Sequence, residues 1–127
     1  MQDSEKIIDY WKTHAQYDLD TAGSLFDSKR YPYTLFMCHL AIEKSLKAII
    51  VKKTLEHAPY THNLVHLATT TELAFSPEQK TLIAELNEFN LDARYPDWKE
   101  NFYTIATHAY TEKYLHATRE LFVWLTH

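Results

Sequence analysis

Glycine and cysteine are almost missing from this 127-residue chain, which has one of each, and proline occurs only four times. Because glycine and proline make most sharp turns, their scarcity argues against a sheet protein with many hairpins. A single glycine also excludes a phosphate-cradling loop and a dinucleotide-binding fingerprint, since both need several glycines. One cysteine cannot form an internal disulfide, and the apolar surroundings of Cys38 in the sequence predict a buried, unreactive thiol.

Positive charge is in the minority, with 13 Lys and Arg against 17 Asp and Glu, and the formal net charge is −4. This balance disfavours a general nucleic-acid binder, because neutralisation of phosphates supplies most of that affinity. The first ten residues are polar and acidic and lack the apolar core of a signal peptide. The longest apolar stretch carries four ionisable side chains, so we expect no membrane span. Together these features predict a single cytoplasmic domain over residues 1–127.

Apolar residues recur at steps of three or four along most of the chain, the spacing of amphipathic helices. The predicted helices run from Ser4 to Ser28, from Pro32 to Thr54, from His62 to Leu73, from Ser76 to Arg94, and from Asp97 towards the C-terminal end. Brief connections between such helices predict an all-α fold. We expect an up-and-down, mostly antiparallel bundle of four long helices and one short helix.

The second predicted helix is apolar around most of its circumference between Leu35 and Val51, so other helices or a second subunit must cover it. His39, Glu43 and Lys47 follow one another at steps of four and form a polar stripe along this helix. We expect the stripe to lie near a cleft or a second subunit. The alternative is a solvated face, on which a Glu–Lys pair contributes only about 0.2–0.5 kcal/mol.

His62 and His66 lie four residues apart, a spacing used by pairs of metal ligands. No Glu, Asp or Cys accompanies them at a recognisable spacing, so we expect neither a metal nor a cofactor. His62 either serves the start of the third helix or hydrogen-bonds through its ring in a polar pocket.

Charged and aromatic residues lie close together at the predicted end of the fourth helix, in the segment Ala93-Arg94-Tyr95-Pro96-Asp97. In a purely structural interpretation, Arg94 lies near the last carbonyls, Pro96 ends the helix and Asp97 caps the next one. In a functional interpretation, Arg94 binds a phosphate through two hydrogen bonds, Tyr95 stacks on a base and Asp97 orients Arg94.

Four segments of the chain resemble HEPN domains in order and spacing. They are Asp18–Ala22, Phe36–Ala48, Thr61–Leu64 and Ala93–Asp97. The resemblance covers nearly the whole chain and implies a helical bundle, a homodimer with a cleft near its axis, and a minimal nucleotidyltransferase as partner. Some members of the family are RNA-cleaving toxins, and others are nucleotide-binding or non-catalytic partners. The candidate ligand-binding residues on this basis are His39, Glu43, Lys44, Lys47, His62, Arg94, Tyr95 and Asp97.

Members of the ribonuclease branch carry an Arg followed by a His after four to six residues. In this chain the window after Arg94, from Lys99 to Asn101, contains no His, and the next one is His108. RNA cleavage needs one group to activate the 2′-hydroxyl and another to stabilise the phosphorane charge, and Arg94 suits only the second task. The sequence therefore favours a nucleotide-binding or partner-binding module over an enzyme. The alternative is a metal-independent RNase toxin of a toxin–antitoxin pair, in which His62 or His39 replaces the missing histidine.

Overall fold

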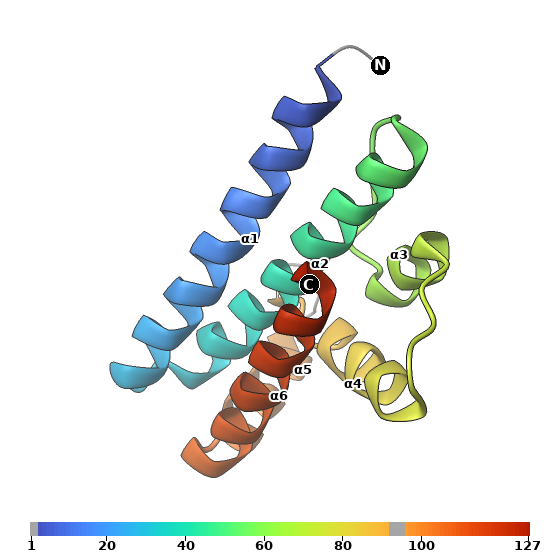
Figure 1. The fold of residues 1–127 in the computed structure, drawn as a ribbon. Helices are drawn as coiled ribbons and strands as arrows, with labels where there is room; N and C mark the ends of the chain where they lie inside the picture. Colours follow the sequence, from blue (N-terminus) through green and yellow to red (C-terminus); the bar gives the residue numbers. More distant parts are fainter. Residues whose placement is uncertain (1–2, 92–95) are drawn as a thin grey trace.

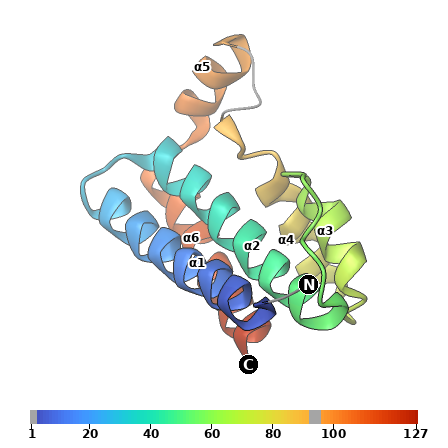
Figure 2. The same ribbon diagram turned by 90° about the horizontal axis from the view of Figure 1, so that it is seen from above.

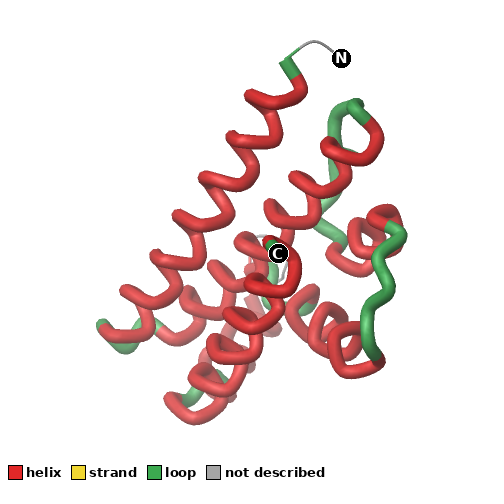
Figure 3. Tube along the Cα trace, viewed as in Figure 1, coloured by secondary structure: helices red, strands yellow, loops and turns green. Residues whose placement is uncertain are grey.

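The computed structural model describes residues 3–91 and 96–127, and of Asp97 only the backbone. Over these residues the chain is all-α, as predicted, and helices are joined by short loops without any strand (Figure 3). The helices are α1 (Ser4–Asp27), α2 (Tyr31–Thr54), α3 (Leu64–Thr71), α4 (Pro77–Asn87), α5 (Pro96–Ile105) and α6 (His108–Thr126).

The second helix lies at the centre of the bundle, where α1 runs antiparallel along one side of it (Figure 1). Helices α6 and α3 pack on its other sides, and every helix from α1 to α6 contributes side chains to one hydrophobic core. Leu35, Ile42 and Leu46 of α2 have no exposed surface at all. Helices of the same chain therefore cover most of the apolar circumference of α2, while Phe36, Met37, Leu40 and Ile49 remain partly exposed. Within the described residues, no helix has the length and apolar character needed to cross a bilayer.

The predicted helix boundaries agree with the structure to within two residues except at two places. The fourth helix ends at Asn87 instead of Arg94, and the last predicted helix is divided into α5 and α6. The division falls at Thr107, whose side chain accepts a hydrogen bond from the Tyr110 N–H and so caps α6. Figure 2 shows the consequence, because α5 projects from one end of the bundle while α6 packs along α2.

Three helices are followed by a residue in the left-handed backbone conformation, although the chain has almost no glycine. Lys29, Leu55 and Glu72 follow α1, α2 and α3 with φ values of 63°, 57° and 60°. Glycine usually occupies such positions because it lacks the Cβ that clashes there. The one glycine, Gly23, instead lies inside α1, where an added Cβ would be 2.8 Å from Nη2 of Arg119 on α6.

Candidate functional site

Glu43 forms the centre of a buried polar cluster on α2. Its side chain is only 4% exposed, and its Oε1 lies 2.9 Å from Nδ1 of His62. Its other oxygen, Oε2, accepts a hydrogen bond of 3.2 Å from Nζ of Lys47. Nε2 of His39 lies 3.4 Å from Oε1. Three nitrogen-bearing side chains therefore share one carboxylate.

Helical spacing and two side-chain caps bring these groups together. His39, Glu43 and Lys47 are four residues apart, so they occupy one face of α2. His62 comes from the loop that precedes α3, and the chain is anchored directly after it. The side chain of Asn63 caps α3 by accepting from the His66 N–H, and Oδ1 of Asn87 accepts from the Leu64 N–H at 2.8 Å.

His39 connects the cluster to the end of α4. Its ring is completely buried, and Nδ1 lies 3.0 Å from the carbonyl oxygen of Leu86. A carbonyl oxygen only accepts, so Nδ1 carries a proton. Nε2 faces the Glu43 carboxylate at ion-pair distance but without hydrogen-bond geometry. Both ring nitrogens therefore lie near acceptors, and the Nδ1 contact with Leu86 fixes the orientation of the ring.

The environment of Glu43 keeps its carboxyl ionised. Burial alone would raise the pKa of this group, because removal from water penalises the charged form. The contacts with His39 and His62 and the charge of Lys47 outweigh burial and lower the pKa of Glu43 from 4.5 to about 2. Glu43 therefore carries a negative charge below the surface at neutral pH.

A pocket of about 590 Å³ opens above this cluster, between the first turns of α1, the second half of α2 and the loop after α2. Tyr10, Trp11 and Tyr60 bring aromatic rings to its lining. Nitrogen-bearing side chains also line it, namely Lys6, Lys47, His57 and His62. Nζ of Lys47 lies 5.1 Å from the centre of the Trp11 ring, within cation–π range. Figure 1 shows the start of α1 and the end of α2 at the same end of the molecule.

The pocket combines two kinds of recognition. Its volume lies within the range of small-molecule sites, about 300–1,000 Å³. Aromatic rings can stack on a planar group, and lysine and histidine nitrogens can bind an anion. Across the described residues, no group of three or more His, Cys, Asp and Glu side chains is placed to hold a metal ion.

The structure brings together four of the residues that the sequence analysis selected: His39, Glu43, Lys47 and His62. They are buried or line the pocket, so the solvated-face alternative for the α2 stripe does not apply to Glu43 or Lys47. Lys44 lies elsewhere, with Nζ 2.6 Å from Oδ2 of Asp18 on α1. That ion pair joins two helices and lies outside the pocket lining.

The remaining selected residues cannot be placed in the site. Arg94 and Tyr95 lie outside the described residues, and so does the side chain of Asp97. A ligand-binding role for these three residues stays a prediction.

The sequence analysis missed most of the pocket wall. Trp11 shares the helical spacing of the buried face of α1, and that spacing cannot distinguish a core residue from one beside a pocket. Tyr60 was assigned only to a loop, although an aromatic residue two positions before His62 was a usable signal. Its side chain is fully exposed at the edge of the pocket.

Comparisons with known proteins agree with this architecture. A family model described as HEPN domain matches residues 8–127. The chain also resembles the crystal structure of TT1696 from Thermus thermophilus, with a TM-score of 0.77 and 16% sequence identity. That alignment covers 94% of this chain and 95% of TT1696, and at such low identity it shows a shared fold. No curated protein matches the chain.

Proposed function

This chain belongs to the HEPN domain family, and on that premise we propose that it is a binding module whose α1–α2 pocket takes a nucleotide. One observation carries the proposal: aromatic rings and cationic side chains meet in one pocket of suitable size. The base would stack on Trp11 or Tyr60, a contact that contributes about 1–3 kcal/mol per base in single-stranded nucleic-acid sites. The phosphate would bind near Lys6, His57 and Lys47.

The buried cluster has a structural role in this proposal. Glu43 orients His62 and Lys47 from below, so that the two side chains reach the pocket in fixed positions. His39 in turn holds Glu43 against α4 through its contact with Leu86. Fixed positions reduce the conformational entropy that a ligand must remove on binding. Arg94, Tyr95 and Asp97 remain proposed additional contacts.

Titration calorimetry with purine and pyrimidine nucleotides tests the proposal. We expect saturable binding by the wild type and about tenfold weaker binding by Tyr60→Ala and by Lys6→Ala. Tyr17→Ala and Lys80→Ala are matched controls, because both side chains are exposed and neither lines the pocket. Binding that all four variants retain would place the ligand elsewhere. If no nucleotide gives binding heat or thermal stabilisation at millimolar concentration, the proposal of nucleotide binding is refuted.

A protein partner is the second half of the proposal. The resemblance to HEPN proteins supports a homodimer that works with a minimal nucleotidyltransferase. Co-expression with a minimal nucleotidyltransferase, followed by affinity purification and light scattering, tests both statements. A stoichiometric complex and a dimeric mass are expected. A monomer that never retains the nucleotidyltransferase would contradict this half and leave the ligand half intact.

Ribonuclease activity is a second candidate, and the His62–Glu43 contact specifically favours it. A carboxylate only accepts hydrogen bonds, so Nδ1 of His62 donates to Glu43 and the lone pair of the neutral ring lies on Nε2. A carboxylate-oriented imidazole of this kind is suited to take the proton from a 2′-hydroxyl. This contact supports His62 as the base that the Arg-to-His spacing of the sequence leaves unfilled.

RNA cleavage assays separate the two candidates. A ribonuclease that uses this site loses activity about 100-fold or more in His62→Ala, the usual contribution of general base catalysis. His66→Ala provides the control, since this exposed histidine lies one turn further along in α3. The variant Arg94→Ala tests whether Arg94 stabilises the phosphorane charge. Equal cleavage by the wild type, His62→Ala and Arg94→Ala would rule out the ribonuclease assignment.

A further inference from the structure

A groove of about 450 Å³ runs between α4 and α6, away from the α1–α2 pocket. The α4 wall presents Glu78, Leu82 and Glu85 at steps of four and three. The α6 wall presents Ala117, Leu121 and Trp124, again at steps of four and three. Each wall is therefore one face of a helix, and the two faces form a continuous channel.

The floor of this groove is apolar and open to solvent. Trp124 is 42% exposed, and its ring centre lies 5.3 Å from that of Phe75. Phe75 does not line this groove but lines a second hollow of about 420 Å³ between α3 and α4, together with Val65 and Leu73. The aromatic pair thus separates two adjoining apolar hollows. Contiguous exposed apolar surface of this kind marks interaction sites on soluble proteins.

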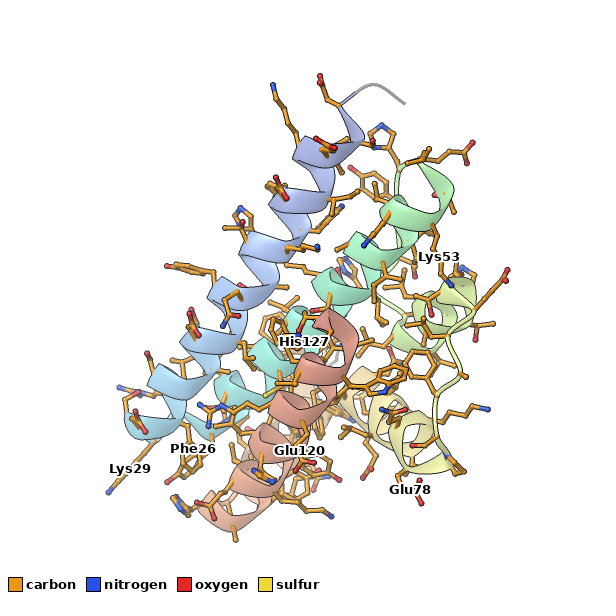
Figure 4. All side chains as sticks on the ribbon, viewed as in Figure 1. Phe26, Lys29, Lys53, Glu78, Glu120 and His127 are labelled. Atoms are coloured by element: carbon orange, nitrogen blue, oxygen red, sulfur yellow. The ribbon has the colours of Figure 1, made fainter. Side chains whose placement is uncertain are left out.

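The edges of the groove are acidic. Glu78 and Glu85 border it on α4 and Glu120 on α6, and Lys113 adds a cation to its lining. Glu78 and Glu120 are labelled on their two helices in Figure 4. Nζ of Lys113 lies 5.2 Å from the centre of the Tyr114 ring, so this charge is already directed at an aromatic face. Glu120 pairs with His116, and Glu85 accepts a hydrogen bond from the Tyr114 hydroxyl.

We infer that this groove is the docking site for an amphipathic helix of a partner protein, with an apolar face flanked by Lys and Arg. A helix in a groove between two helices buries its apolar stripe, and its basic edges meet the glutamates. The 11 residues of α4 span about 16 Å, enough for three turns of the incoming helix. A second copy of this chain has a net charge of −4, so its surface is on average less complementary to these acidic edges than a basic helix is.

The inference does not depend on nucleotide binding. The groove is formed by α4 and α6, whereas the proposed nucleotide pocket is formed by α1, α2 and the loop between α2 and α3. A partner helix and a nucleotide can therefore bind at the same time, and each site can be disabled without altering the residues of the other.

A designed 18-residue helical peptide of leucine and lysine is the probe, and its fluorescence anisotropy reports binding. A peptide in which every lysine is replaced by glutamate is the matched control. We expect the basic peptide to bind and the acidic peptide not to bind. The double reversal Glu78→Lys/Glu120→Lys should weaken binding at least about tenfold, and Trp124→Ala should weaken it similarly through the lost apolar contact.

The double variant Glu5→Lys/Glu112→Lys tests whether net charge alone explains the weaker binding. It changes the total charge by the same amount, and neither residue lines the groove. An equal loss in both double variants would overturn the inference, because binding would then follow overall charge. Equal binding of the two peptides would overturn it as well. Sedimentation velocity tests whether a second copy of this chain occupies the groove. If the wild type self-associates and Trp124→Ala is monomeric, the groove is the interface between two copies and the inference is overturned.

Discussion

Replacing Glu43 by glutamine should change both the stability of the protein and the pH dependence of that stability. The side chain is almost isosteric, so the substitution removes the charge and leaves the shape of the cluster. A folded-state pKa of about 2 against an ordinary 4.5 corresponds to about 3 kcal/mol at neutral pH, at 1.36 kcal/mol per pKa unit. Because the amide oxygen still accepts hydrogen bonds, we expect a loss of about 2 kcal/mol.

The pH window follows from the direction of the shift. A carboxyl whose pKa is lowered on folding stabilises the protein above the unfolded pKa, and this contribution disappears as the pH falls to the folded pKa. The difference between wild type and Glu43→Gln should therefore be full above about pH 4.5 and vanish near pH 2. Urea denaturation followed by circular dichroism at several pH values measures it.

A surface glutamate provides the control for this experiment. Glu112 is 65% exposed and faces His108 at 3.6 Å on α6, so Glu112→Gln should change stability by less than about 0.5 kcal/mol at any pH. A Glu43→Gln loss of the same size at pH 2.5 and pH 7 would refute the reasoning, since the cause would then be packing. A loss below about 0.5 kcal/mol at pH 7 would refute it too.

Three further predictions concern the helices and the buried thiol. Gly23→Ala should stabilise the protein by up to about 1 kcal/mol in urea denaturation, because alanine favours the helix and the Arg119 side chain can move aside; a loss would mean that the guanidinium is fixed. Leu55→Gly should stabilise by about 1 kcal/mol in the same assay, since Leu55 has left-handed backbone and is 55% exposed; an unchanged midpoint would contradict a strained helix end. Burial raises the pKa of the Cys38 thiol to about 12, so a disulfide reagent at pH 8 should modify it only as the protein unfolds, and immediate modification of the native protein would disprove this protection.

The fold was largely predictable because its signal is local. Apolar spacing located the helices, and the scarcity of glycine and proline excluded a hairpin-rich alternative. The division between α5 and α6 was missed because the apolar spacing of Phe102, Ala106 and Tyr110 continues across it. α5 ends at Ile105 and Thr107 caps α6, but a threonine inside an apolar repeat is an ordinary feature of a continuous helix.

Only the part of the site that lies on α2 was predictable from the sequence. The stripe of His39, Glu43 and Lys47 follows from steps of four on one helix. The approach of His62 to Glu43 depends on contacts between elements far apart in the sequence, including the cap that Asn87 places on Leu64. No local pattern carries that information. Lys44 is the opposite case: the family resemblance selected it, while its side chain pairs with Asp18 on α1 and lies outside the pocket lining.

The central carboxylate also sets a trade-off between folding and affinity. Glu43 is ion-paired with Lys47 and accepts a hydrogen bond from His62, and Lys47 is one of the side chains that the proposed phosphate would contact. An anion must therefore compete with a resident negative charge, which limits how tightly the pocket can hold it. Any substitution that frees those nitrogens by removing the charge loosens the attachment of α2 to the loop before α3. Selection for higher affinity for an anionic ligand would thus oppose selection for a more stable fold. This arrangement therefore favours moderate affinity and rapid dissociation of the ligand.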